Sequence, residues 1–273
     1  MRKIIKAVIF DWAGTTIDYG CFAPVQGFID GFESVGIDIT NEMIRQPMGL
    51  PKLEHVKAIS AMLETPLNED EIQQVYEIFE ISLLVNLDNY CEINDYVLET
   101  IKELKERSIH IGSTTGYTAA MIEKILPRIR AQGYEPEYWI TPEQVSKARP
   151  YPYMIWSNMM HFEISDPKEV IKIGDTIVDI EEGKNADCWT VGIIMGSSLL
   201  GLSKIEVEKL SEADLKNEME RVRAVYYQAG ADYIIDDLSD LPSVIDKINN
   251  SLRQNHANKL LTPSQLTTRK AIK

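Results

Sequence analysis

The chain has 273 residues, of which 44% are hydrophobic, and it carries a net charge of −14 at neutral pH. This length allows one large α/β domain or a core with a smaller second domain, and the sequence has no apolar run of about 18 residues that would indicate a transmembrane helix. The acidic balance makes nucleic acids and anionic membranes poor partners, and three scattered cysteines without metal-ligand spacing favour a reducing, cytoplasmic location.

Short apolar runs rich in β-branched residues predict parallel strands that are buried on both faces. They occupy residues 4–10, 109–113, 138–141, 170–174, 190–195 and 233–235. From residue 108 onward they alternate with helical stretches at residues 118–131, 153–162, 177–186 and 211–229. This alternation predicts a doubly wound, Rossmann-like α/β fold with a parallel sheet.

The connection between the first two predicted strands is too long for a single crossover. It contains about 95 residues, whereas a parallel crossover needs only one helix. Helical stretches fill it at residues 24–35, 52–63, 68–86 and 93–107. We therefore expect a core domain of residues 1–19 and 101–273 with an inserted helical domain of residues 20–100. The weakly patterned tail after residue 250 predicts a loosely ordered end.

Polar residues follow three of the predicted strands, where open α/β sheets bind their ligands. Asp11 ends the first run, the turn at residues 112–117 (GSTTGY) follows the second, and Asp175 and Asp179 follow the fourth. Carboxylates at the ends of buried strands repel each other unless a cation neutralises them, and Mg²⁺ suits carboxylates together with phosphate oxygens. The turn can offer N–H groups and hydroxyls to a phosphate.

Each of these clusters also has a purely structural interpretation. Asp11 could end a strand, Asp175 and Asp179 could cap the following helix, and residues 113–116 could form an ordinary turn. Their shared position at the carboxyl ends of predicted strands favours a common site. The sequence has neither a GxSxG motif nor a GxxxxGK[ST] phosphate loop.

These residues resemble the motifs of the haloacid dehalogenase superfamily. Its pattern places a nucleophilic Asp after the first strand, a Ser or Thr after the second, a later Lys or Arg, and a Gly-Asp-x-x-x-Asp motif. The corresponding residues here are Asp11, Thr115, Arg149 and the stretch at 174–179. The resemblance reaches residue 250 or so, and the helical insertion is similar to the superfamily's cap domain.

The resemblance implies a Mg²⁺ cofactor held by Asp11, the backbone carbonyl of Ala13 and Asp175, with Asp179 supporting these ligands. One position departs from the superfamily's phosphatases, which carry a second Asp two residues after the nucleophile as general acid. Ala13 occupies that position here. A phosphate-ester leaving group would therefore lack its proton donor.

This variant, DWAGTT at residues 11–16, resembles the phosphonoacetaldehyde hydrolase family, which cleaves a carbon–phosphorus bond to give acetaldehyde and phosphate. Residues 47–55, 112–117 and 148–152 resemble that family as well. A carbon leaving group needs an electron sink instead of a proton donor, and a lysine imine provides one. The resemblance gives this role to Lys52 in the cap, and it places the reaction in the degradation of 2-aminoethylphosphonate.

The expected reaction begins with condensation of Lys52 with the aldehyde, and Asp11 then attacks phosphorus to form an aspartyl phosphate. His55 lies three residues after Lys52, so a helix would place both on one face, where His55 could move protons or simply pack. The other expected phosphonate-binding or imine-packing residues are Met48, Thr115, Gly116 and Arg149. The resemblance also implies a homodimer.

Three other functions compete with this interpretation. The first is a sugar-phosphate phosphatase or phosphomutase of the same superfamily, which Ala13 disfavours. The second is a dehalogenase, which needs no Mg²⁺ and leaves Asp175 without a role. The third is a non-catalytic sensor of phosphorylated ligands, which the combination of Asp11, Arg149 and Asp175 disfavours.

Overall fold

The computed structural model describes residues 4–260, and six parallel strands form its central sheet. They are β1 (Ala7–Phe10), β2 (His110–Thr114), β3 (Tyr138–Ile140), β4 (Val170–Gly174), β5 (Trp189–Ile193) and β6 (Tyr233–Ile235). Their order across the sheet is β3-β2-β1-β4-β5-β6, and every neighbouring pair is parallel. The predicted doubly wound α/β fold is therefore confirmed.

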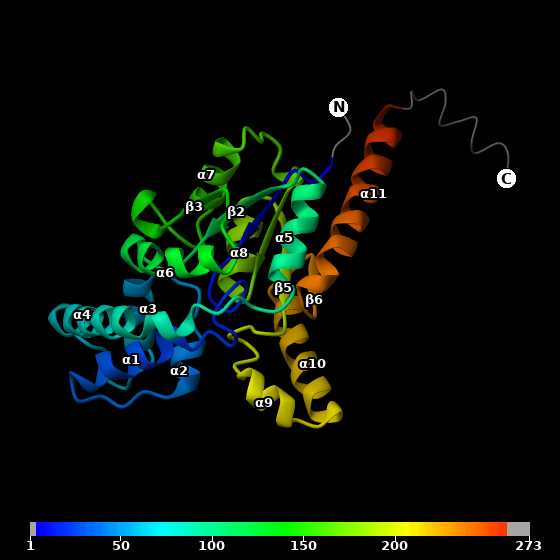
Figure 1. Ribbon diagram of the computed structural model, residues 1–273. Coiled ribbons are helices and arrows are strands. Elements are labelled where there is room, and N and C mark those ends of the chain that lie inside the picture. Colours follow the sequence, from blue (N-terminus) through cyan, green and yellow to red (C-terminus); the bar gives the residue numbers. More distant parts are fainter. Residues whose placement is uncertain (1–3, 261–273) are drawn as a thin grey trace.

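Helices cover both faces of the sheet (Figure 1). Val8 and Phe10 of β1 share one apolar cluster with α5 (Val97–Glu106), α6 (Ala119–Ala131) and α11 (Leu241–Leu260). Successive side chains of a strand point to opposite faces. Ala7 and Ile9 accordingly share a second cluster with α7 (Tyr153–His161). Helices α8 (Ile177–Asn185) and α10 (Glu212–Gln228) pack against each other near β5.

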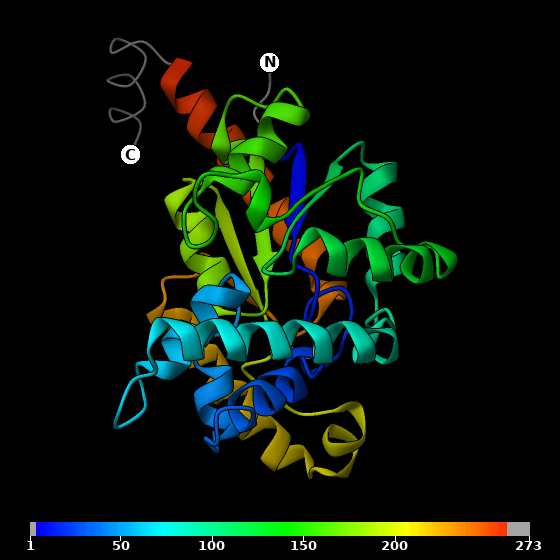
Figure 2. The same cartoon turned by 90° about the vertical axis from the view of Figure 1, so that its left-hand side faces the viewer.

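Four helices from the connection between β1 and β2 gather beyond the carboxyl end of the sheet (Figures 1 and 2). They are α1 (Ala23–Glu33), α2 (Asn41–Arg45), α3 (Lys52–Ser60) and α4 (Glu69–Asn86). Phe28 of α1 stacks on Phe79 of α4 with ring centroids 4.2 Å apart. A Cβ at Gly31 would lie 2.7 Å from the carbonyl oxygen of Val75, so glycine permits this close packing. The division into core and cap domains stays a prediction.

Several short elements and the last helix were not among the elements predicted from the sequence. The short elements are η1 (Leu87–Tyr90), η2 (Pro142–Gln144), η3 (Pro167–Glu169), α9 (Lys204–Lys209) and η4 (Leu238–Asp240). The last helix, α11, continues to Leu260. Buried Ile245, Ile248 and Leu252 recur at helical spacing and hold α11 against the core. The expected loose end lies outside the described residues.

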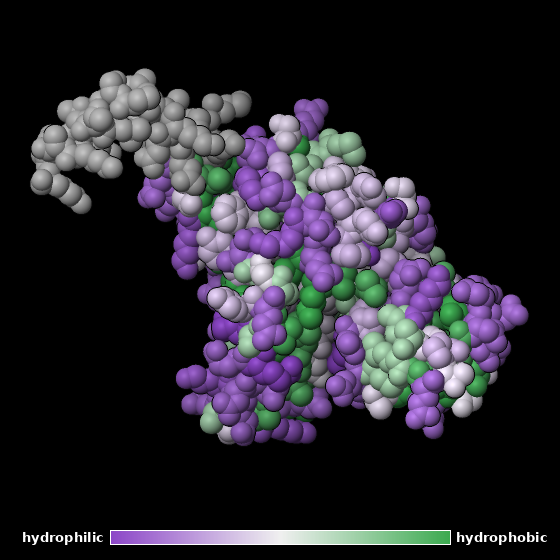
Figure 3. Space-filling view, turned by 180° about the vertical axis from the view of Figure 1, so that it is seen from behind, coloured by the Kyte–Doolittle hydropathy of each residue, from purple (hydrophilic) through white to green (hydrophobic). Residues whose placement is uncertain are grey.

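The surface agrees with the acidic, polar composition. The face in Figure 3 is mostly hydrophilic, and its apolar side chains gather between two projecting lobes and on the lobe that carries α1 to α4. Within residues 4–260, no helix has both the length and the apolar composition needed to cross a bilayer. Cys21, Cys91 and Cys188 are buried and unpaired.

Candidate active site

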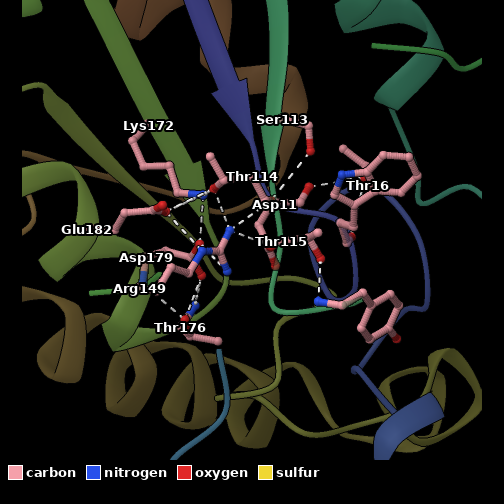
Figure 4. Close-up of polar contacts among 12 residues, drawn as sticks. Asp11, Thr16, Ser113, Thr114, Thr115, Arg149, Lys172, Thr176, Asp179 and Glu182 are labelled. Carbon is pink, nitrogen blue, oxygen red and sulfur yellow. Dashed lines mark hydrogen bonds and ion pairs between the residues drawn. The ribbon is translucent and has the colours of Figure 1, made fainter. Parts of the chain in front are cut away.

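Acidic side chains from neighbouring strand ends meet at one edge of the sheet. Asp11 follows β1, Asp175 follows β4, and Asp179 lies in the first turn of α8. All three are buried, and one carboxylate oxygen of each lies within 4.8 Å of the others. Thr176 caps α8 and fixes Asp179, because its hydroxyl accepts the Asp179 N–H at 3.2 Å and donates to Oδ2 at 2.6 Å (Figure 4).

The protein alone does not balance these charges. Burial raises the pKa of Asp11 despite the nearby Arg149, and burial together with Asp11 and Asp179 raises the pKa of Asp175 well above its usual range. Burial also opposes ionisation of Asp179, but Arg149 and Lys172 hold its pKa below the ordinary value. A cation beside Asp11 and Asp175 would favour the charged forms of these two carboxyls.

One oxygen of the cluster has no partner. Oδ2 of Asp175 accepts the Ser198 N–H at 2.8 Å, whereas Oδ1 is buried without a hydrogen-bond partner among the described residues. A buried, unpaired carboxylate oxygen beside two further carboxylates fits Mg²⁺, which prefers such ligands. Ala13 lines the same small cavity as Asp11 and Asp175, and the ligand role expected for its carbonyl stays a prediction.

Gly14 makes room for the carboxylate of Asp175. A Cβ at this position would lie 2.2 Å from Oδ2 of Asp175, and the backbone of Gly14 has a left-handed φ of +81°. Both features favour glycine. Gly14 lies within the stretch DWAGTT at residues 11–16, but its packing against Asp175 was not predicted from the sequence.

Arg149 binds the nucleophile candidate and two further acids through separate nitrogens. Nη2 lies 2.8 Å from Oδ1 of Asp11, Nη1 lies 3.1 Å from Oδ1 of Asp179, and Nε lies 2.9 Å from Oε2 of Glu182. Nη2 also donates to the carbonyl oxygen of Thr114 at 2.8 Å. The planar guanidinium is thereby fixed in one orientation, with Asp11 at one end.

Thr114, Lys172 and Glu182 complete this network. Lys172 and Glu182 were not predicted from the sequence, and Thr114 was predicted only as part of the phosphate-binding turn. Nζ of Lys172 lies 2.8 Å from the Thr114 hydroxyl, 2.9 Å from Oδ1 of Asp179 and 3.3 Å from Oε2 of Glu182 (Figure 4). All are buried. Asp11, Asp179 and Glu182 thus pair with Arg149 or Lys172. Asp175, which belongs to the same acidic cluster, forms an ion pair with neither of these two bases.

The predicted phosphate-binding turn follows β2 directly. Thr115 is the first residue after the strand, and its hydroxyl accepts the Tyr117 N–H at 3.0 Å (Figure 4). A Cβ at Gly116 would lie 2.8 Å from the carbonyl oxygen of Leu50. The segment before α3 therefore lies backbone to backbone against this turn, and a side chain at position 116 would separate them.

Lys52 is the first residue of α3 and is buried beside the acidic cluster. Its Nζ lies 5.2 Å from the ring centroid of Tyr117 and 5.9 Å from that of Phe28. It forms neither a hydrogen bond nor an ion pair with the part of the chain that the structure describes. Burial lowers the pKa of Lys52, with Cys21 and Asp11 partly opposing this shift. The side chain is therefore suited to react as a free amine.

His55 lies one turn further along α3 and is fully buried. Its ring packs against Phe28 at a tilt of 37°, with ring centroids 4.0 Å apart, and Nε2 lies 2.7 Å from the carbonyl oxygen of Ile44. A carbonyl only accepts, so Nε2 carries the proton, while Nδ1 is buried without a partner among the described residues. Burial and Lys52 hold the pKa of His55 well below its usual range, so the ring is neutral.

These residues enclose one very small space. Asp11, Met48, Lys52 and Arg149 line a cavity of about 20 Å³. That is room for roughly one water molecule and too little for an organic phosphonate. Outside it, a groove of about 800 Å³ runs between α3 and the loop at residues 142–151, and Arg149 lines both spaces. The small cavity must therefore widen before a substrate can contact Asp11.

Comparison with known proteins agrees with this geometry. A family model for haloacid dehalogenase-like hydrolases matches residues 5–187. The chain is 44% identical over 255 residues to the phosphonoacetaldehyde hydrolase of Bacillus cytotoxicus, with 89% of this chain and 96% of the relative covered. It is also 39% identical over 292 residues to a bifunctional phosphonoacetaldehyde hydrolase/aminoethylphosphonate transaminase of Clostridioides difficile, covering 100% of this chain and 46% of the relative.

A solved structure extends the likeness to the whole fold. The crystal structure of a phosphonoacetaldehyde hydrolase-like protein from Oleispira antarctica superposes with a TM-score of 0.89 at 30% identity, covering 93% of this chain and 95% of the other. The chain is therefore a hydrolase of the haloacid dehalogenase-like group and belongs, within it, to the phosphonoacetaldehyde hydrolase family.

Proposed function

We propose that the protein hydrolyses the carbon–phosphorus bond of phosphonoacetaldehyde to acetaldehyde and phosphate, as a step in 2-aminoethylphosphonate degradation. The observation that carries this proposal is the buried, unpaired amine of Lys52 in the same closed cavity as Asp11. Ala13 supports it, because a carbon leaving group needs the electron sink that an imine supplies and not the missing acid. The bifunctional relative, whose name includes an aminoethylphosphonate transaminase, supports the pathway.

The two reacting groups come from different parts of the fold. Asp11 follows the central strand, whereas Lys52 begins a helix of the α1–α4 group. We propose that residues 20–100 act as a cap over a core of residues 1–19 and 101–273. Closure would bring Lys52 to Asp11 and exclude water while the imine persists.

Mg²⁺ would be held by Asp11, the carbonyl of Ala13 and Asp175, with Asp179 fixed behind them by Thr176 and Lys172. When bound, it would neutralise phosphonate oxygens and reduce their repulsion of the attacking carboxylate. Arg149, which holds Oδ1 of Asp11, would also neutralise phosphonate oxygens.

The reaction would begin on Lys52. Its free amine adds to the aldehyde carbon, and loss of water gives a protonated imine, with Nδ1 of His55 available to accept and return a proton. A carboxylate oxygen of Asp11 then attacks phosphorus. The carbon–phosphorus bond breaks, and its electron pair moves into the imine, which becomes an enamine.

Two hydrolyses complete the cycle. The enamine takes a proton on carbon, and water releases acetaldehyde and regenerates the amine of Lys52. A second water cleaves the aspartyl phosphate on Asp11 and releases phosphate. Thr115 and Gly116 would bind the phosphoryl oxygens in both half-reactions, and Met48 would pack beside the imine. The homodimer and the cytoplasmic location stay predictions.

The decisive experiment is borohydride trapping with phosphonoacetaldehyde or acetaldehyde, followed by peptide mass spectrometry. We expect a reduced adduct on Lys52 that is absent in Lys52→Arg. Lys57→Arg is the matched control, because Lys57 lies on the same helix but is partly exposed and paired with Glu54 at 3.2 Å. A folded protein with no adduct on Lys52 would remove the electron sink and return the phosphatase alternative to first place.

A further inference from the structure

Arg45, the last residue of α2, links the α1–α4 group to the loop behind the acidic cluster. Its Nη1 donates to two carbonyl oxygens, that of Gly20 at 2.9 Å and that of Ser198 at 3.1 Å. Its guanidinium carbon also lies 4.9 Å from the ring centroid of Phe22. Gly20 and Phe22 lead into α1, whereas Ser198 belongs to the loop after β5. One cation therefore joins two parts of the molecule that are far apart in sequence.

Ser198 is also the residue that holds Asp175. Its backbone N–H donates to Oδ2 of Asp175 at 2.8 Å, and the residue is buried. The loop around it is a tight turn in which the Gly201 N–H donates to the carbonyl of Ser197 at 2.9 Å. A Cβ at Gly201 would lie 3.2 Å from Nε of Arg45, so the turn fits closely around the guanidinium.

We propose that Arg45 is a positioning residue for Asp175. By holding the carbonyl of Ser198 from α2, it fixes the residue whose N–H orients Oδ2, and this leaves the unpaired Oδ1 of Asp175 available to Mg²⁺. The inference rests on the proposed function, in which Asp175 is a metal ligand. Residues behind a metal ligand set its orientation and thereby the affinity of the site.

The hydrogen bond between Arg45 and Ser198 also couples Mg²⁺ binding to the closed arrangement, in which α2 lies against the loop after β5. Any movement of α2 away from the sheet that admits substrate breaks the hydrogen bond between Arg45 and Ser198. The open arrangement should therefore bind Mg²⁺ less tightly, and by linkage Mg²⁺ should favour the closed one. The side chain that transmits this effect lies on α2, outside the motifs that supply the nucleophile and the metal ligands.

Arg221 provides a matched control within the same loop. Its Nη2 donates to the carbonyl oxygen of Leu199 at 2.9 Å, and Leu199 directly follows Ser198. Arg221 belongs to α10, which packs on the sheet side, so its contact does not cross to the α1–α4 group. Arg45→Gln and Arg221→Gln thus each remove a guanidinium–carbonyl bond from the same loop, but only the first separates the loop from α2.

The test is the dissociation constant of Mg²⁺, measured without turnover by titration calorimetry. Arg45→Gln should weaken binding about tenfold, the lower end of the range for a residue that supports a metal ligand, and Arg221→Gln should stay within about twofold. Arg45→Lys should recover part of the loss. Amide hydrogen exchange in residues 197–201 should quicken in Arg45→Gln, and the melting temperature without Mg²⁺ reports any general loss of stability.

The outcomes separate the two proposals. If the unaltered protein binds Mg²⁺ and Arg45→Gln binds it equally well, the positioning role is wrong while the proposed function stands. Equal weakening by Arg221→Gln would also overturn the role, because any disturbance of the loop would then suffice. If the unaltered protein does not bind Mg²⁺, the metal site of the proposed function fails, and the inference fails with it.

Discussion

Nη2 of Arg149 lies 2.8 Å from Oδ1 of Asp11, although 138 residues separate them in the sequence. The same guanidinium also reaches Asp179 and Glu182, so its orientation is fixed by three acids at once. This geometry holds the buried guanidinium of Arg149 against Asp11, the residue expected to attack phosphorus. It also explains why a smaller or more mobile cation should not replace it.

Arg149→Lys should lower kcat by at least about 100-fold, the effect of removing one preorganised donor from developing charge. A lysine ammonium cannot span the positions of Nε, Nη1 and Nη2. Steady-state kinetics at saturating Mg²⁺ would measure the loss, with circular dichroism as the check on folding. If the variant kept an activity within a few-fold of that of the unaltered protein, the three-nitrogen contact of Arg149 would not contribute to the reaction.

Glu182→Gln should destabilise the fold as well as slow the reaction. Its carboxylate pairs with Arg149 at 2.9 Å and with Lys172 at 3.3 Å in a fully buried setting. Removing one member of a buried ion pair costs about 3 kcal/mol. Urea unfolding would measure this loss, and Glu181→Gln is the control because Glu181 is exposed on the same helix. Equal stability of the two variants would contradict the prediction.

Asp175→Asn should abolish the stabilisation that Mg²⁺ gives. At a Mg²⁺ concentration of about 100 times the dissociation constant, the unaltered protein should gain about 2.7 kcal/mol over the protein in EDTA. The variant should gain nothing. In EDTA it should be the more stable of the two, because burial and the neighbouring acids disfavour the charged carboxylate. Unfolding in urea with Mg²⁺ or EDTA checks both statements, and a variant that keeps the gain would exclude Asp175 as a ligand.

His55→Gln should slow imine formation without unfolding the protein. Glutamine can keep a donor to the carbonyl of Ile44, which lies 2.7 Å from Nε2, but it offers no base at the position of Nδ1. Loss of a positioned proton acceptor lowers a rate by about 100-fold or more. The rate of borohydride trapping measures the effect, and the melting temperature shows whether packing survives. An unchanged trapping rate would mean that His55 only packs.

Asp18 should make the stability of the fold depend on pH. Burial raises the pKa of Asp18 to about 7, although hydrogen bonds from the N–H groups of Ala23 and Phe22 lower it. Between the ordinary value of 3.8 and about 7, the folded protein keeps a proton that the unfolded chain has lost. The free energy of unfolding should therefore fall as pH rises through this window.

Asp18→Asn tests this dependence, because asparagine does not titrate and keeps one of the two oxygens that accept the N–H groups of Phe22 and Ala23. Its free energy of unfolding, measured in urea between about pH 4 and pH 7, should fall less steeply than that of the unaltered protein. Parallel curves would show that other groups cause the slope.

Much of the site could be predicted from sequence because parallel strands bring their carboxyl ends together. Asp11, Thr115 and Asp175 each follow an apolar run, and the strand order places these three ends side by side. Lys52 could not be placed beside them by any local pattern. Its burial depends on how α3 packs against the turn after β2, and only the family resemblance pointed to it.

The missed residues show where local patterns fail. Lys172 interrupts an apolar strand, and Glu182 follows Asp179 by three residues on α8, yet neither signal identifies a partner until the fold is known. Helix α2 has only five residues, too few to show a period. The start of α9 is marked in the sequence, because Ser203 and Glu206 form a capping box.

The close approach of Gly116 to the carbonyl of Leu50 has a consequence for how freely the two segments can change over evolution. The contact joins backbone to backbone, so it places little demand on the Leu50 side chain. Position 116 does not tolerate a side chain, because even a methyl group would lie 2.8 Å from the carbonyl oxygen of Leu50. Substitutions at position 50 can thus accumulate and vary the lining of the outer groove, while the closed cavity remains sealed.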